Sequence, residues 1–163
     1  MPEVVVIGAG VMGASVGWHL AVRGCRDVLV LDRASGLGQG STGRATGGFR
    51  AQFATPVNIR LSLLSREKLL RFPDEIGADS GYRPYGYLFL ADDEAQMAAL
   101  RSIRPLQRGL GVPVEEIGPE DALRLNPAVN PEGIAGGSFC PIDGFIRPLN
   151  ILNGYVEAAR RLG

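Results

Sequence analysis

The sequence feature that most constrains the fold is a glycine turn between an apolar run and a longer amphipathic stretch. The apolar run Val4–Ile7 leads directly into residues 8–13, which read GAGVMG and have the spacing G-x-G-x-x-G. The stretch after the turn ends near Arg23, and a second apolar run then closes on Asp32. This order predicts a parallel strand, a crossover helix and a second parallel strand.

The three glycines of this turn each have a physical role in holding an adenine dinucleotide. Gly8 permits the tight turn, and Gly10 lets the backbone approach a pyrophosphate without a side chain in between. Gly13 lets the helix lie close to the preceding strand. A glycine-rich strand–helix turn without any ligand would explain the same three residues.

The acid at the end of the second run favours the ligand-binding interpretation. Asp32 follows at about the 20-residue distance at which a carboxylate accepts hydrogen bonds from an adenosine ribose. The helix begins at Val11, and its first residues, Val11 and Met12, present free N–H groups and the positive end of the helix dipole to the phosphates. The spacing therefore predicts an adenine-dinucleotide site.

Composition excludes several other classes of function. The chain has 163 residues, enough for an ordinary domain with a core, and 17 basic and 17 acidic residues balance each other. Neither nucleic acid nor an anionic membrane is an expected partner. With one histidine and two distant cysteines, Cys25 and Cys140, no metal site is expected, and both thiols are predicted to be reduced and half-buried.

The apolar stretch over residues 4–22 resembles a signal peptide or membrane span only in hydropathy. Residues 1–3 carry no basic side chain, and glycines and His19 interrupt the stretch. Buried parallel strands with their packing helix give the same hydropathy. We therefore expect a soluble, cytoplasmic protein.

The segment after Asp32 is unusually rich in glycine. A nicotinamide-binding domain would continue with a helix and a third strand, but six glycines lie between Gly36 and Gly48. So many glycines exclude a stable helix or central strand. The segment is predicted to be backbone laid against something flat or anionic, which argues against a nicotinamide-dependent dehydrogenase.

The remaining elements are predicted from periodicity and from capping residues. A helix capped by Thr55 starts at Pro56 and ends at Pro73, and a strand over residues 85–91 turns Tyr85, Tyr87 and Phe89 to one face. Further strands are expected at residues 3–7, 27–32, 114–117 and 134–140. Further helices are expected at residues 11–23, at residues 119–126, and from Pro148 to the C-terminal arginines. One more helix is expected from Asp92 or Asp93 toward Gly109, with Pro105 kinking or shortening it.

Three further segments carry a resemblance to a known family. Together with residues 8–13 and Asp32, the segments at residues 40–43 (GSTG), 47–50 (GGFR) and 141–148 (PIDGFIRP) resemble the D-amino-acid oxidase superfamily of FAD-dependent oxidoreductases. The similarity is greatest to its sarcosine oxidase, glycine oxidase and proline dehydrogenase branch, and it covers essentially the whole chain.

The resemblance implies an α/β fold, with a Rossmann-like FAD-binding βαβ unit and part of a mixed-sheet substrate domain. Residues 1–78 and 141–163 would belong to a discontinuous FAD-binding domain, and residues 79–140 to the substrate-binding domain. Members of the family are commonly more than twice this length. We therefore expect this chain to be the N-terminal part of such a protein, incomplete relative to the family.

The resemblance also implies cofactor-binding residues, position by position. Asp32 would bind the adenosine ribose, and Arg33 would lie beside the adenine. The other implied cofactor-binding residues contact the diphosphate, the ribityl chain or the isoalloxazine: Gly8, Gly10, Val11, Met12, Gly13, Gly40, Ser41, Thr42, Ala45, Thr46, Gly47 and Gly48.

Arg50 matches the position at which sarcosine-oxidising relatives hold an arginine that pairs with the substrate carboxylate. A guanidinium suits this task because its planar fork binds a carboxylate through two hydrogen bonds. The alternative is an arginine at the surface or on an FAD phosphate.

The glycine-rich loop lacks the histidine through which some relatives attach flavin covalently. His19, on the first helix, is the only histidine in the chain and is expected to pack there. FAD is therefore expected to be held non-covalently.

The reaction that the resemblance implies is oxidation of a C–N bond in an amino or N-methyl amino acid, by hydride transfer to flavin. No catalytic residue is assigned in this chain. Tyr85, Tyr87 and Phe89 either line the substrate cavity or pack the sheet on its neighbour. A non-catalytic FAD-binding module that needs a partner chain, or self-associates, remains an alternative, and a nicotinamide-dependent dehydrogenase is a weaker one.

Overall fold

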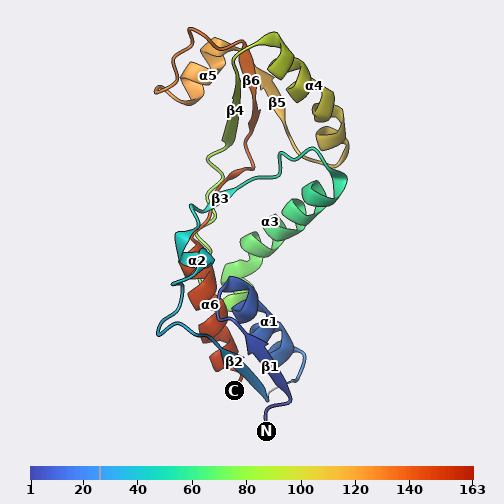
Figure 1. Cartoon of the computed structure of the whole chain (residues 1–163). Coiled ribbons are helices and arrows are strands. Elements are labelled where there is room, and N and C mark those ends of the chain that lie inside the picture. The colour runs from blue at the N-terminus through green and yellow to red at the C-terminus, as the bar shows by residue number, and fades with distance from the viewer. Residues whose placement is uncertain (26) are drawn as a thin grey trace. The chain divides into compact units, whose positions relative to one another are not determined.

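The computed structural model describes residues 1–25 and 27–163 of the chain (Figure 1). It contains two compact units. Unit 1 consists of residues 1–48, 68–82 and 146–163, and unit 2 of residues 49–67 and 83–145. The predicted assignment of 1–78 and 141–163 to a cofactor domain and of 79–140 to a substrate domain stays a prediction.

Unit 1 contains the βαβ element that the glycine turn predicts. Strands β1 (Val4–Ile7) and β2 (Val28–Leu31) pair in parallel, and helix α1 (Val11–Val22) connects them. The register sets each residue from 4 to 7 opposite its partner from 28 to 31. The α/β fold class is confirmed.

The two faces of this small sheet differ in how well they are covered. Val6 lies under α1, since a Cβ added to Gly13 would stand 3.3 Å from a methyl group of Val6. Every second residue of each strand points to the opposite face. That face carries exposed apolar side chains: Val5, Ile7, Leu29 and Leu31.

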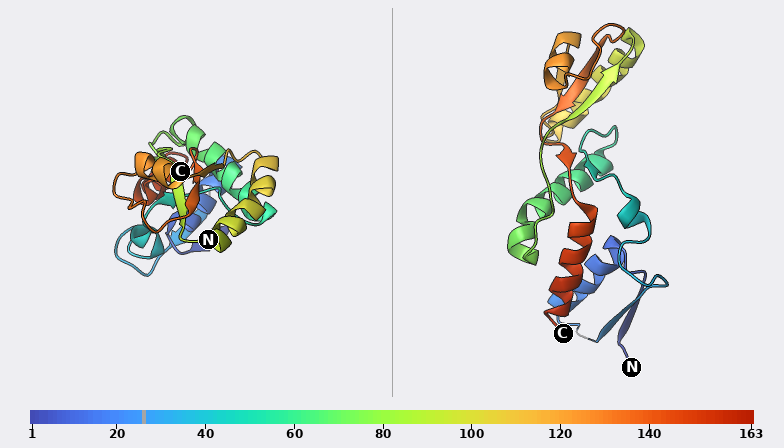
Figure 2. Two further views of the ribbon diagram at one scale, coloured as in Figure 1. Left: turned by 90° about the horizontal axis from the view of Figure 1, so that it is seen from above. Right: turned by 90° about the vertical axis from the view of Figure 1, so that its left-hand side faces the viewer.

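Helix α6 (Pro148–Arg160) lies beside α1 and completes the core of unit 1 (Figures 1 and 2). The core joins Phe72 and Ile76 of helix α3 (Pro56–Ile76) to Ile151 and Ala158 of α6. On the side of α1, Trp18 packs against this core.

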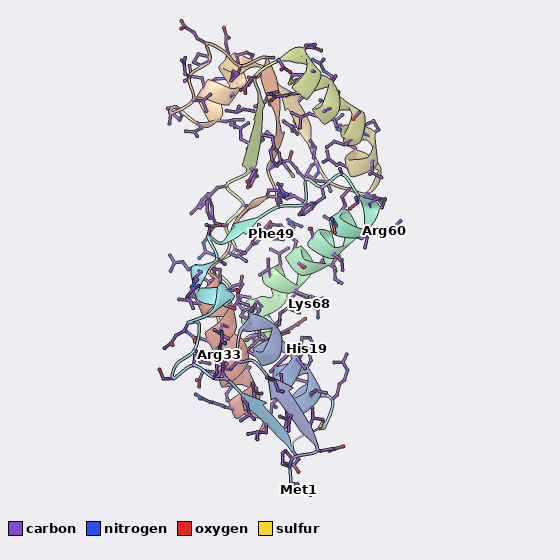
Figure 3. The ribbon with its side chains drawn as sticks, viewed as in Figure 1. Met1, His19, Arg33, Phe49, Arg60 and Lys68 are labelled. Carbon is purple, nitrogen blue, oxygen red and sulfur yellow. The ribbon has the colours of Figure 1, made fainter. Side chains whose placement is uncertain are left out.

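His19 has the packing role that the sequence predicts. Its ring lies 4.6 Å from that of Trp18 and 6.1 Å from that of Tyr155, measured between centroids. Its Nδ1 lies 2.8 Å from the carbonyl oxygen of Ser15, one turn earlier on the helix (Figure 3).

Helix α3 (Pro56–Ile76) is longer than predicted, because Pro73 lies within it and does not end it. A proline has no N–H to donate to the carbonyl group four residues earlier, which here belongs to Leu69. The hydroxyl of Ser80 donates to that carbonyl instead, at 3.2 Å. The helix ends three residues later, before Gly77, whose φ is +79°.

Unit 2 is built on a three-stranded antiparallel sheet. Strand β6 (Gly136–Cys140) lies between β4 (Tyr87–Ala91) and β5 (Glu115–Ile117), and helices α4 (Glu94–Gly109) and α5 (Pro119–Leu125) flank the sheet (Figure 2). Asp93, rather than Asp92, caps α4 by accepting the N–H of Gln96. Pro105 lies inside α4 without shortening it. Two-residue strands β3 (Gly48–Phe49) and β7 (Gly144–Phe145) pair with each other.

Two details of unit 2 correct the sequence-based expectations. Tyr85 lies before β4 and is 74% exposed, because Gly86 has a φ of +89° and interrupts the extended backbone. Only Tyr87 and Phe89 share a face of the strand, and their rings lie 5.1 Å apart. Cys140 is fully buried in the core rather than half-buried, and both cysteines are free.

Over residues 1–25 and 27–163, none of the helices combines the length and apolar character needed to cross a membrane.

Candidate functional site

A trough of about 830 Å³ lies in unit 1 at the carboxyl ends of β1 and β2. Ligands of open α/β sheets bind at this edge. We call it the glycine trough. Three segments line it: residues 7–13, residues 32–34, and residues 36–45 without Leu37, Gly43 and Arg44.

The first glycine turn is as tight as its sequence predicts. Gly8 has a φ of +103°, which L-residues with a side chain rarely adopt. A Cβ on Gly13 would overlap the carbonyl oxygen of Gly8. Gly10 is the N-cap of α1, and the first turn of that helix contains no acidic residue. The helix N-terminus therefore faces the trough with its positive charge uncompensated by its own side chains.

A second turn with the same spacing faces the same trough, which our sequence analysis missed. Residues 38–43 read GQGSTG, again G-x-G-x-x-G. Gly38 has a φ of +74°, and a Cβ on Gly43 would overlap the carbonyl oxygen of Gly38, as Gly13 would overlap Gly8. A short helix, α2 (Ser41–Arg44), begins after Gly40 just as α1 begins after Gly10. The signal was present in the spacing, but no strand precedes it.

The two turns touch through one side chain. The hydroxyl oxygen of Thr42 accepts the N–H of Val11 at 3.1 Å, so it partners the first amide of α1. A Cβ on Gly10 would lie only 3.3 Å from the same hydroxyl oxygen. A glycine at this position thus leaves room for Thr42 to approach the helix.

Asp32 lies at the edge of the trough with both carboxylate oxygens hydrogen-bonded to backbone. Its Oδ1 accepts the N–H of Ala34 at 2.8 Å and its Oδ2 that of Ala9 at 2.7 Å. These two bonds, of which the one from Ala34 is the larger cause, hold the pKa of Asp32 below its ordinary value. The side chain is exposed and ionised, so it can accept further hydrogen bonds from a sugar. Arg33 follows it, also exposed (Figure 3).

Most of the predicted cofactor-binding residues gather here, and three do not. Those that line the trough are Gly8, Gly10, Val11, Met12, Gly13, Asp32, Arg33, Gly40, Ser41, Thr42 and Ala45. Thr46, Gly47 and Gly48 lie outside its lining. Gly47 is buried with a φ of +83°, and its carbonyl accepts the N–H of Ile146 at 2.8 Å.

The trough fits an adenine dinucleotide by its chemistry. Glycine backbone, a helix N-terminus and an acid at the end of β2 are the donors and acceptor that a diphosphate and a ribose require. Over the described part of the chain, no three His, Cys, Asp or Glu side chains are placed to hold a metal ion.

Arg50 lies in a different pocket, wholly within unit 2, with a volume of about 410 Å³. We call it the arginine pocket. The guanidinium carbon of Arg50 stands 4.5 Å from the ring centroid of Phe53 and 5.4 Å from that of Phe89. Among the described residues Arg50 has no carboxylate partner, so its charge is balanced only by aromatic faces.

The irregular segment after Arg50 is held from several sides by buried polar groups. Asp143, with no exposed surface, accepts the N–H of Ala51 at 2.7 Å. The amide of Gln52 donates to the carbonyl of Tyr87 at 2.9 Å and accepts the hydroxyl of Ser138 at 2.7 Å. These bonds fix a segment that belongs to neither helix nor strand.

Phe53 is fixed as well, because the side-chain amide of Gln107 on α4 donates to its carbonyl at 3.1 Å. Burial raises the pKa of the Asp143 carboxyl, against the opposing effect of its hydrogen bond from Ala51. Burial, with Asp143 nearby, raises the pKa of the Cys140 thiol to about 12. Cys140 is therefore an inert core residue rather than a nucleophile.

Comparison with known proteins agrees with this geometry. The sequence profile of one family, described as "DAO: FAD dependent oxidoreductase", matches residues 3–163. FAD-dependent oxidoreductase domain-containing protein 1 of Bos taurus is 33% identical over 172 aligned positions, which cover 99% of this chain and 35% of that protein. Glycine oxidase of Geobacillus kaustophilus is 30% identical, over 99% of this chain and 44% of that protein.

A solved structure, that of L-proline dehydrogenase from P. horikoshii, superposes with a TM-score of 0.90 at 31% identity. The match covers 99% of this chain and 42% of that one. The chain thus spans less than half the length of these relatives.

Proposed function

Because the chain belongs to the DAO family of FAD-dependent oxidoreductases, we propose that it is the flavin-binding part of an enzyme that oxidises a C–N bond of an amino or N-methyl amino acid. The observation that carries the proposal is the meeting of two G-x-G-x-x-G turns and Asp32 in one trough. Bound FAD supplies the acceptor for the hydride that leaves the carbon next to nitrogen.

The residues of the glycine trough have distinct roles in this proposal. The N–H groups at the start of α1 bind the diphosphate, and Asp32 binds the adenosine ribose. The Thr42 hydroxyl accepts the first N–H of α1 and keeps its own hydrogen to donate to the diphosphate. Ala45 lines the trough and would lie against the isoalloxazine ring, whereas Thr46, Gly47 and Gly48 lie outside the lining. His19 packs on α1 away from the trough lining, which supports non-covalent attachment within this part of the protein.

Arg50 binds the carboxylate of the substrate. Its guanidinium lies against the rings of Phe53 and Phe89 and pairs with no carboxylate of the described residues, so its N–H donors remain for the substrate carboxylate. Two of the similar proteins are named for amino acids, glycine oxidase and L-proline dehydrogenase, which supports an amino acid as the substrate. The protein's own task is to fix this carboxylate, and thereby the C–N bond, in one orientation.

The test is to purify the full-length protein of which this chain is a part, saturate it with FAD and record the visible flavin spectrum under anaerobic conditions. Addition of glycine, sarcosine, L-proline or D-alanine is expected to bleach the flavin for at least one of them. In an Arg50→Ala variant the concentration needed for bleaching is expected to rise while FAD binding is unchanged. A protein that binds no FAD at all would contradict the proposal.

A second candidate function is a non-catalytic FAD-binding module that needs a partner chain. The exposed apolar face of β1 and β2 favours it, since such faces are covered in functional assemblies. This candidate expects a flavin-loaded protein that no amine reduces until the partner is added. Bleaching by an amine with the purified protein alone would exclude it.

A further inference from the structure

The arginine pocket has a chemical character that goes beyond a carboxylate site. Its lining comes from the segment after β3, from β4 and β6, and from α4, and consists of Arg50, Gln52, Phe53, Ala54, Thr55, Asn58, Phe89, Leu100, Ile103, Gln107 and Ser138. No acidic residue is among them, and Arg50 is the one charged group. The volume of about 410 Å³ lies in the range of about 300–1,000 Å³ that is typical of small-molecule sites.

The polar groups deep in this pocket are engaged within the protein. Gln52, Ser138 and Gln107 are at most 5% exposed. The Gln52 amide bonds at one end to the backbone of β4 and at the other to the hydroxyl of Ser138, and Gln107 bonds to the backbone of Phe53. Since these groups already have partners, a polar ligand side chain would be desolvated there without compensation.

The surfaces that remain for a ligand are apolar. Phe53 and Phe89 stand beside the guanidinium, and Leu100 and Ile103 of α4 line the same pocket, all four of them half-buried. The exposed Thr55 and Asn58 belong to the lining as well. The pocket thus combines one fixed cation with a hydrophobic cavity larger than glycine or sarcosine requires.

We infer that the arginine pocket selects amino acids with a hydrophobic side chain or N-substituent, with Arg50 on the carboxylate and with Phe53, Phe89, Leu100 and Ile103 around the apolar part. This inference rests on the proposed function for its substrate, but it makes a claim about binding that holds without flavin. It names Ile103 and Leu100 as residues that set specificity.

Calorimetric titration of the purified protein with three simple probes tests the binding claim. 3-Methylbutanoate is expected to bind at least about tenfold more tightly than acetate, because it buries three more carbon atoms. The neutral alcohol 3-methyl-1-butanol is expected to bind at least about tenfold more weakly than 3-methylbutanoate, because it has neither the charge nor the second oxygen that a two-pronged bond to a guanidinium requires. Equal binding of either pair overturns the inference.

Variants locate the site. Arg50→Ala is expected to weaken 3-methylbutanoate binding by about tenfold or more, whereas Arg60→Ala, an exposed arginine of α3 outside the pocket lining, leaves it unchanged (Figure 3). Ile103→Ala is expected to lower the ratio of 3-methylbutanoate to acetate affinity by about threefold or more. Leu110→Ala, at the C-cap of the same helix and packed against the core, lowers stability without changing the ratio. An unchanged ratio in Ile103→Ala refutes the role of α4.

Turnover separates this inference from the proposed function. If the flavin is bleached equally by glycine and leucine, the inference fails and the function stands. If no FAD binds but the carboxylate preference persists, the function fails and the pocket assignment stands. Faster bleaching by leucine, valine or proline than by glycine and sarcosine supports both.

Discussion

At the scale of single residues, Asp32 and Asp143 show how the environment gives two chemically identical side chains different roles. Asp32 is exposed, accepts two backbone N–H groups and is held ionised. Asp143 is fully buried and accepts the N–H of Ala51. The first is placed to bind a ligand, whereas the second organises the segment that carries Arg50.

Asp32→Ala is expected to weaken FAD binding by about tenfold to a hundredfold, the effect of losing hydrogen bonds to a charged acceptor. Fluorescence titration of the apoprotein with FAD measures this change. Asp74→Ala, which removes an exposed acid of α3 outside the trough lining, is the matched control. Equal FAD affinity in the Asp32→Ala variant and the parent would remove Asp32 from the site.

Compared with the parent, the Asp143→Asn variant is expected to become more stable as the pH rises. Because burial raises the pKa of Asp143 in the folded state, its contribution to stability is complete below the ordinary value of 3.8 and is lost as the pH rises through the folded-state value. Asparagine does not ionise. Urea unfolding at pH 4, 6 and 8 should show that the free energy of unfolding of the variant rises relative to that of the parent as the pH rises. A difference between the two that does not depend on pH would contradict this.

At the scale of elements, the βαβ unit was predictable because its signals are local. Apolar runs, a turn motif and an acid all lie within one short stretch of sequence. The end of α3 was not predictable, since the hydroxyl that compensates for Pro73 belongs to Ser80, in a separate segment. Sequence periodicity likewise placed Tyr85 on β4, but the backbone conformation of Gly86 excludes it.

The candidate site, like the fold, was predictable where its signals are local in the sequence and not where they depend on distant contacts. The glycines and Asp32 were recognised from spacing, but the polar groups around Arg50 were not, because their partners are distant in the sequence. Asp143 is 92 residues from Ala51, Ser138 is 86 from Gln52, and Gln107 is 54 from Phe53. No periodic pattern links such pairs. The second glycine turn has a readable spacing in residues 38–43, although no strand directly precedes it.

Gly43→Ala tests whether the second turn is built like the first. Its Cβ would overlap the carbonyl oxygen of Gly38, so we expect the turn to be distorted, with loss of at least about 2 kcal/mol of stability and of FAD binding. Gly40→Ala in the same turn meets no atom within 4 Å and is the matched control for stability. Thermal unfolding with and without FAD measures both. Two variants of equal stability would argue against the tight turn.

At the scale of the whole molecule, the chain leaves one sheet face without a cover. Val5, Ile7, Leu29 and Leu31 are 48%, 89%, 43% and 48% exposed, although all four are apolar. Contiguous apolar surface of this kind binds other apolar surface. The chain also spans only 35% and 44% of the two curated relatives described above.

The double variant Ile7→Thr, Leu31→Thr is expected to bind a hydrophobic dye less than the 163-residue parent while remaining folded. Threonine keeps the preference for a strand and adds a hydroxyl on an exposed face. Dye fluorescence and circular dichroism measure the two properties. Val6→Thr, on the face covered by α1, is the contrasting control and should lower stability instead. Unchanged dye binding in the double variant would show that the dye binds elsewhere.

The discontinuity of unit 1 has a consequence for the order in which the chain folds during synthesis. Residues 49–145 leave the ribosome before α6, yet Ile151 and Ala158 of that helix are needed to close the core around Phe72. The glycine turn therefore emerges first, but the unit that holds it is completed last. Contacts of such long sequence separation slow folding. Nascent chains should thus acquire protease resistance in unit 2 before they acquire it around the glycine trough.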